Sequence, residues 1–203
     1  MTILIVIITV GISMLAFSNR EIMDKLQFTP YRTIHNKEWH RLITHGFVHA
    51  DYMHLFINMF VLYSFGSAVE NIFKGLQYSG IIQSWVLHFS VLYLGGIVIA
   101  SLTTLKKHKD NFYYHSVGAS GAVSAIVFTY IFFEPIQMFL FPPMPAFLYG
   151  IVYLAYTHYM SKKGGDNINH DAHFIGSVFG FIYPLLINPK LFFVFLERLG
   201  IIN

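Results

Sequence analysis

Long apolar segments alternate along the chain with short polar ones. Six stretches carry no Asp, Glu, Lys or Arg, and they cover residues 2–19, 52–69, 75–105, 111–133, 135–161 and 172–189. Each is long enough for, or close to, the about 20 apolar residues that a helix needs to cross a bilayer. The pattern therefore predicts six transmembrane helices, which we expect near residues 2–19, 52–71, 81–105, 117–133, 143–161 and 171–188.

The composition agrees with a membrane protein. Of the 203 residues, 55% are hydrophobic and 11% are charged, whereas a soluble domain carries roughly 25% charged residues. Six spans use about 120 residues, so no room remains for a separate soluble domain. We expect an all-α, polytopic protein in which residues 1–203 form a single membrane domain.

Charge and cysteine content exclude several functions. The formal net charge is +3, and the basic residues are scattered over the loops, which argues against a nucleic-acid partner. Cysteine is absent. Disulfides, thiolate metal sites and a cysteine nucleophile are thereby excluded.

Two segments outside the expected spans have a distinct composition. Residues 20–51 mix charged side chains with aromatic ones such as Trp39 and Phe47, and they are too many for a simple turn. We predict an ordered loop that is partly embedded in the membrane. The tail, residues 189–203, is apolar after Pro189, and we predict a short amphipathic helix at the membrane interface.

Several polar side chains fall inside the expected spans, where they are energetically costly and often functional. His54 and Asn58 lie one helical turn apart in the second span, Ser120 opens the fourth, and His173 opens the sixth. If the spans alternate in direction, the second, fourth and sixth enter from the same side. The four side chains are then expected at similar depth.

Glycines accompany these polar residues, at Gly118, Gly121, Gly176 and Gly180. Two of them bracket Ser120, and the other two form a GxxxG stripe that continues the face of His173. Small residues in this spacing let two membrane helices approach closely. We therefore expect the fourth and sixth spans to pack together and to bring His173 to Ser120.

These groups could supply the nucleophile, the base and the oxyanion donors that an acyl-transfer reaction needs. A serine hydroxyl becomes a nucleophile when a base such as a neutral imidazole takes its proton. The resulting oxyanion needs donors held ready for it. His54, Asn58 and the backbone N–H of Ser120 at the start of a helix can supply them.

Simpler interpretations compete with this one. A run of small residues such as GASGA commonly serves helix packing, and we interpret Ser124 in that way. His45, His49 and His115 lie near the ends of spans and are interpreted as anchors of loops, with His49 expected to bond within the first loop.

A metal site is the competing chemistry for the histidines. No H-E-x-x-H occurs, and no carboxylate inside a span accompanies His54 or His173 except Asp171 at the edge. We therefore expect neither a metal ion nor a cofactor.

Four motifs in order resemble the rhomboid intramembrane serine proteases. They are Trp39 and Arg41 in the long loop, HADYMHLFINMF followed by FGSAVE, GASG, and AHFIG with Gly180. The resemblance implies a six-helix rhomboid bundle and a Ser/His dyad without a third acidic member, with Ser120 as nucleophile and His173 as base. It also implies that His54 and Asn58 help to hold the oxyanion.

The same resemblance implies the partners. The substrates would be transmembrane helices of other proteins, cut at or near their membrane end, and the lipid bilayer would be the solvent. We expect a multi-pass protein of a bacterial inner membrane. Two alternatives are a catalytically silent rhomboid-like protein that binds membrane clients and a small transporter or channel. An intact dyad argues against the first, and polar groups confined to one side argue against the second.

The chain departs from the family pattern in two places. Family members often carry an aromatic residue four positions after the nucleophile, whose ring lies against the catalytic histidine, and this chain has Ser124 there. His40 separates Trp39 from Arg41, which are adjacent in many relatives.

Orientation is predicted differently by two criteria. Most Lys and Arg fall in the first, third and fifth loops, and a simple count would place these loops in the cytoplasm. Resemblance to six-span rhomboids implies that the active centre opens outward, and we adopt this orientation.

Overall fold

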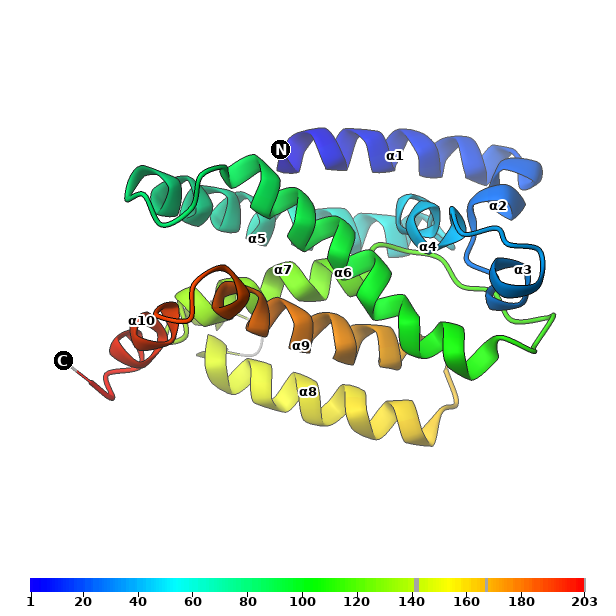
Figure 1. The fold of residues 1–203 in the computed structure, drawn as a ribbon. Helices are drawn as coiled ribbons and strands as arrows, with labels where there is room; N and C mark the ends of the chain where they lie inside the picture. The colour runs from blue at the N-terminus through cyan, green and yellow to red at the C-terminus, as the bar shows by residue number, and fades with distance from the viewer. Residues whose placement is uncertain (141–142, 167, 203) are drawn as a thin grey trace.

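A computed structural model describes residues 1–140, 143–166 and 168–202. Six long helices dominate it, α1 Thr2–Ser18, α5 Tyr52–Tyr78, α6 Trp85–His108, α7 Ser120–Phe133, α8 Ala146–Lys163 and α9 His170–Ile187. They lie side by side in one bundle, with α1 and α8 on opposite sides in Figure 1. The mostly helical architecture that the sequence predicts is therefore observed.

Helix ends differ from the expected ones for local reasons. The helix α6 begins at Trp85 instead of residue 81, because the Ser84 side chain accepts the N–H of Leu87 and caps the helix there. The helix α7 begins at Ser120 instead of residue 117, since Gly118 has a φ of 114° that no helix accommodates. The helix α5 continues to Tyr78, beyond the expected residue 71.

Length and hydropathy of the observed helices support fewer membrane spans than the six that the sequence pattern predicts. Among the described residues, α5 and α6 are by themselves long and apolar enough to cross a membrane. The pair α9 and α10 Leu191–Arg198, bent by 120°, would add a third, while α1 and α7 are apolar but shorter. The expected six-span count is not confirmed by this criterion.

Residues 20–51 are ordered and form short helices, α2 Arg20–Leu26, α3 Pro30–His35, α4 Arg41–Thr44 and the 3-10 turn η1 His45–Phe47. Arg41 holds them together from inside, where its side chain is 1% exposed. Its guanidinium donates to the Glu38 carboxylate at 2.5 Å and to the carbonyl oxygens of Asp24 and Gln27 at 2.6 and 2.7 Å. We call residues 20–51 the first loop; in Figure 1 it covers the end of the bundle at the right.

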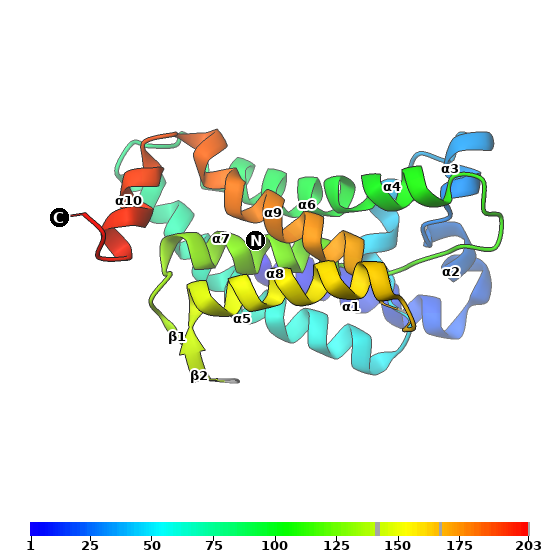
Figure 2. The same ribbon diagram turned by 90° about the horizontal axis from the view of Figure 1, so that it is seen from below.

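The opposite end carries two further elements. An antiparallel hairpin, β1 Met138–Leu140 and β2 Pro143–Pro145, joins α7 to α8; it is visible in Figure 2. The sequence pattern does not predict it, because three-residue strands are too short for a periodic signal. The apolar tail forms the helix α10, where the ring of Phe195 stacks on Phe132 of α7 at 5.2 Å.

The helix α7 forms the centre of the bundle, between α5, α6 and α9. Glycines let its neighbours approach its backbone. A Cβ at Gly176 would overlap the carbonyl oxygen of Gly121, and a Cβ at Gly180 would overlap that of Ala125. Gly121 in turn lies against the methyl group of Ala100 on α6. The relative position of α7 and α9 therefore depends on the absence of these side chains.

We predict that Gly176→Ala destabilises the fold. The added methyl group must push α9 away from the Gly121 backbone, and overpacking of this kind costs about 1–3 kcal/mol. Gly75→Ala is the matched control, because nothing lies within 4 Å of a Cβ at that position. Thermal unfolding in detergent measures both variants. Equal melting temperatures for the two would contradict the close contact between α7 and α9.

Candidate active site

Ser120 is the first residue of α7. The first N–H groups of a helix have no partner within the helix, and the helix dipole adds partial positive charge there. The start of α7 can therefore bind a negatively charged oxygen. Gly118, two residues earlier, turns the chain into the helix with its positive φ.

The backbone before α7 is fastened to the first loop. Phe28 and Ser116 exchange two backbone hydrogen bonds of 2.9 and 3.0 Å, and the N–H of Gly118 donates to the carbonyl oxygen of His45 at 2.9 Å. The N–H of Ala119 donates to Nε2 of His49 at 3.4 Å. The first loop thereby fixes the residues that lead into Ser120.

His49 is buried, and its role differs from the one we expected. It bonds outside the first loop, to the Ala119 N–H and, through Nδ1, to Ser13 Oγ of α1 at 3.0 Å. Because Nε2 accepts, Nδ1 must carry the ring proton. Burial lowers the pKa of His49 to about 3. At neutral pH His49 is therefore an uncharged side chain that links α1 to the start of α7 by hydrogen bonds.

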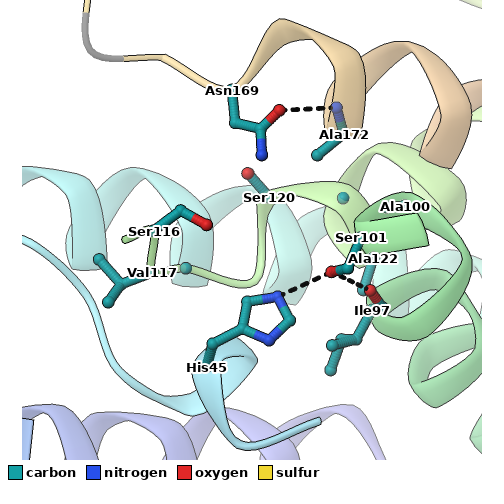
Figure 3. Close-up of a pocket in the computed structure, with 12 residues that line it drawn as sticks. His45, Ile97, Ala100, Ser101, Ser116, Val117, Ser120, Ala122, Asn169 and Ala172 are labelled. Atoms are coloured by element: carbon teal, nitrogen blue, oxygen red, sulfur yellow. Dashed lines mark hydrogen bonds between the residues drawn. The ribbon is translucent and has the colours of Figure 1, made fainter. Parts of the chain in front are cut away.

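His45 links the first loop to α6 by hydrogen bonds, and it lines a small cavity next to Ser120. Its Nδ1 lies 2.8 Å from the Arg41 carbonyl oxygen and its Nε2 lies 3.1 Å from Ser101 Oγ of α6. Burial lowers the pKa of His45 to about 4. The cavity is about 20 Å³ and is also lined by Ser120 and Asn169. In Figure 3 the amide of Asn169 and the hydroxyl of Ser120 point toward one another.

Asn169 connects the start of α9 to α6. Its Oδ1 accepts the N–H of Ala172 and caps α9 at 3.1 Å, and its amide is hydrogen-bonded to Thr104 Oγ1 at 2.8 Å. The sequence analysis did not identify Asn169 as a site residue. The sequence does contain a signal for it, because an asparagine directly before a helix with an acidic residue in its first turn is typical of an N-cap.

His54 and Asn58 approach the site from α5. Their faces meet the turn before α7, because a Cβ at Gly118 would lie 2.6 Å from Cε1 of the His54 ring. The Ala50 N–H donates to Nδ1 of His54 at 3.5 Å. Asn58 donates one N–H to the His54 carbonyl oxygen at 2.9 Å, and its second N–H stays available.

His173, on α9, is held by a tyrosine. Its Nδ1 lies 3.1 Å from the hydroxyl of Tyr153 on α8, and that hydroxyl lies 3.3 Å from Ser124 Oγ. Ser124 therefore has a polar partner, in contrast to the packing role that we assigned to it. Among the described residues no hydrogen bond joins Ser120 Oγ to His173.

One large cavity brings the candidate residues together. It has a volume of about 1100 Å³ and is lined by Ser120, His173, His54, Asn58, Tyr153 and Ser124, among others. Its further walls are apolar side chains of α5, α7 and α8 together with residues of the segments that precede α5, α7 and α9. His115, expected as a loop anchor, also lines this cavity, and its Nδ1 lies 3.2 Å from the Tyr113 carbonyl oxygen.

Comparison with known proteins finds sequences similar to this chain. A family model described as the rhomboid domain matches residues 36–190. The chain is 32% identical over 145 residues to an Arabidopsis thaliana protein named "RHOMBOID-like protein 12, mitochondrial", and the match covers 68% of this chain and 43% of that protein. It is 29% identical over 155 residues to a Bacillus subtilis (strain 168) protein named "Putative rhomboid protease YdcA", covering 76% of this chain and 70% of that protein. The chain thus spans less than half the length of the Arabidopsis protein.

Gly118→Ala is expected to disturb the site. A methyl group there would collide with the His54 ring and shift the chain that leads into Ser120. Displacing reacting groups by about 1 Å can cost on the order of a hundredfold in rate. We expect the rate of reaction at Ser120 to fall by about that factor.

Gly80→Ala is the control for backbone strain. Gly80 has a φ of 74°, and nothing lies within 4 Å of a Cβ there. If both variants lost turnover equally, strain in the backbone would explain the effect, and the contact with His54 would have no special role.

Proposed function

The chain belongs to the rhomboid family, and we propose that it is an intramembrane serine endopeptidase that cleaves transmembrane helices with a Ser120/His173 dyad. The observation that carries the proposal is the shared cavity, where a serine at a helix start and three polar side chains from two other helices come together. Packing alone does not require this combination.

In the proposed reaction, His173 takes the proton of Ser120 Oγ while Oγ attacks the scissile carbonyl carbon. His173 then gives that proton to the leaving amine, and water hydrolyses the acyl-enzyme. No hydrogen bond joins Ser120 to His173 in the part of the chain that the structure describes. Catalytic hydrogen bonds are often long before substrate binds, so we infer that the pair closes when a substrate occupies the cavity.

Three donors are available for the oxyanion. The Ser120 N–H is free by its position at the start of α7. His54 accepts the Ala50 N–H at Nδ1, so a neutral His54 carries its proton on Nε2, the nitrogen nearer Gly118. The second N–H of Asn58 adds a third donor. Donors held in place before reaction stabilise the developing charge without reorganisation.

Water for the second half of the reaction needs a polar route. The small cavity behind Ser120 exceeds the roughly 10–15 Å³ that one water requires, and polar groups of His45, Ser116 and Asn169 line it. It lies at the end of the bundle covered by the first loop. We propose that the deacylating water reaches Ser120 from this end, so that it does not cross hydrocarbon.

The alternative is a rhomboid-like protein that binds membrane clients without cutting them. We favour the protease because Ser120 and His173 are both present and both face the large cavity. The proposed substrates are transmembrane helices of other proteins, and the proposed location is a bacterial inner membrane, crossed six times by α1, α5, α6, α7, α8 and α9.

We predict that Ser120→Ala and His173→Ala each abolish cleavage of a model transmembrane substrate. The two groups act as one unit, so the double variant should be no worse than either single one. A gel assay of cleavage, paired with labelling by a fluorophosphonate serine probe, measures both steps. Cleavage by a folded Ser120→Ala protein would refute the proposed nucleophile. A folded wild-type protein that neither cleaves nor labels would favour the client-binding alternative.

Orientation is testable because the chain has no cysteine. Lys109 directly follows α6, and Tyr78 is the last residue of α5, before the turn that leads into the other end of α6. The Lys109 side chain is 56% exposed and Tyr78 is 97% exposed. We expect a membrane-impermeant maleimide to label Lys109→Cys in intact bacterial cells and to spare Tyr78→Cys.

After lysis both variants should react, which controls for accessibility of the thiol. The reverse pattern in intact cells would mean that the charge count was right and that the active centre faces the cytoplasm.

A further inference from the structure

We propose that Tyr153 is a positioning residue that holds His173 in the orientation and protonation form needed for a base, with Ser124 as its hydrogen-bond acceptor. This inference rests on the proposed function, since it assigns a role within the same site. Tyr153 comes from α8, whereas Ser120 and His173 come from α7 and α9. Because His54 and Asn58 come from α5, α8 is the fourth helix that contributes to the site.

The contacts are both aromatic and polar. The rings of Tyr153 and His173 are nearly parallel, at 11°, with centroids 6.5 Å apart. The Tyr153 hydroxyl is 3.1 Å from Nδ1 of His173 and 3.3 Å from Ser124 Oγ. On the other side, the ring of Phe128 lies 5.9 Å from that of Tyr153. Tyr153 is thus fixed between α7 and α9.

The direction of these hydrogen bonds decides the chemistry. A tyrosine hydroxyl has one proton to donate. If it donated to Nδ1, the neutral imidazole would carry its own proton on Nε2 and could not accept the proton of Ser120. If it donates to Ser124 Oγ, its oxygen accepts Nδ1–H, and Nε2 keeps a free lone pair. Ser124 Oγ can serve as that acceptor, and the direction that we propose, from Nδ1–H to the Tyr153 oxygen and from the Tyr153 hydroxyl to Ser124, gives the productive form.

The position of Ser124 makes this arrangement possible. Its small side chain on α7 leaves room for the Tyr153 ring, which reaches His173 from α8. Ser124 and Tyr153 together thus combine a hydrogen bond with the ring contact to His173.

A carboxylate does not take this role. Asp166, in the loop before α9, is a carboxylate whose charge acts on His173, but its Oδ2 is bound to Nε2 of His170 at 3.0 Å. The charged and titratable groups around His173 are Tyr153 on α8, His170 on α9, His54 on α5 and Asp166. Of these, Tyr153 is the one that bonds to the His173 ring.

The test is a comparison of Tyr153→Phe with Tyr159→Phe. Both lie on α8, and Tyr159 is 58% exposed on its outer side, away from the cavity. We expect Tyr153→Phe to lower kcat about ten- to a hundredfold, the usual cost of losing a partner that orients a histidine. The KM should stay nearly constant, because substrate contacts are kept. Tyr159→Phe should behave as wild type.

The pH profile separates positioning from packing. Loss of the acceptor for Nδ1–H disfavours the protonated imidazole. The acid limb of kcat in Tyr153→Phe should then move to lower pH. Ser124→Ala should lower kcat less than Tyr153→Phe does and should move the acid limb less far to lower pH. Ser124→Thr keeps a hydroxyl, so its kcat should be close to that of the wild type. Because the two residues act through one chain of bonds, the double variant should equal Tyr153→Phe.

The outcomes distinguish this inference from the proposed function. If the wild type cleaves and Ser120→Ala does not, while Tyr153→Phe matches Tyr159→Phe in kcat and pH profile, the positioning role is overturned and the protease stands. A lowered kcat with an unchanged acid limb would also overturn it. A wild type without activity would overturn both proposals. The expected shift, present in Tyr153→Phe and weaker in Ser124→Ala, would support the role.

Discussion

The constraint on which the site depends is that buried backbone N–H groups in a membrane protein need partners from the protein itself. Residues 116–119 have no regular structure and lie between the first loop and the bundle, so their donors need partners. Ser116, Gly118 and Ala119 find them in Phe28, His45 and His49. Ser120 follows directly. The position of the proposed nucleophile is thus set by hydrogen bonds from residues far away in the sequence.

Glycine packing then positions α9 relative to the start of α7. The start of α7 is held by the first loop, and α9 lies against α7 because Gly176 and Gly180 present no side chains. Asn169 then ties the start of α9 to Thr104 of α6. His173 follows one turn later. Two helices that carry the proposed reacting groups are therefore placed by backbone contact and by one capping side chain.

Much of this arrangement could be predicted from the sequence, and the failures have physical causes. The apolar stretches predict the long helices, and motif spacing picks out Ser120 and His173 as candidates, because both depend on local periodicity. Helix ends were wrong where a capping serine or a positive φ at Gly118 decided them. The partners of His49 and the contact of Tyr153 with His173 were missed, since they join elements far apart in the chain and leave no local pattern.

The helix α8 links the proposed chemistry to the wall of the cavity. At the hairpin end an aromatic cluster anchors it, with Tyr149 5.0 Å from Phe139 of the hairpin and Phe139 5.3 Å from Phe65 of α5. One helical turn further along α8, the Tyr153 hydroxyl is bonded to His173, and α8 and α5 both line the large cavity. A guest helix that displaced α8 near Tyr153 would therefore also move the hydrogen bond at Nδ1 of His173. The wall of the cavity and the orientation of the proposed base are coupled through one side chain, because Tyr153 both lines the cavity and is bonded to the imidazole.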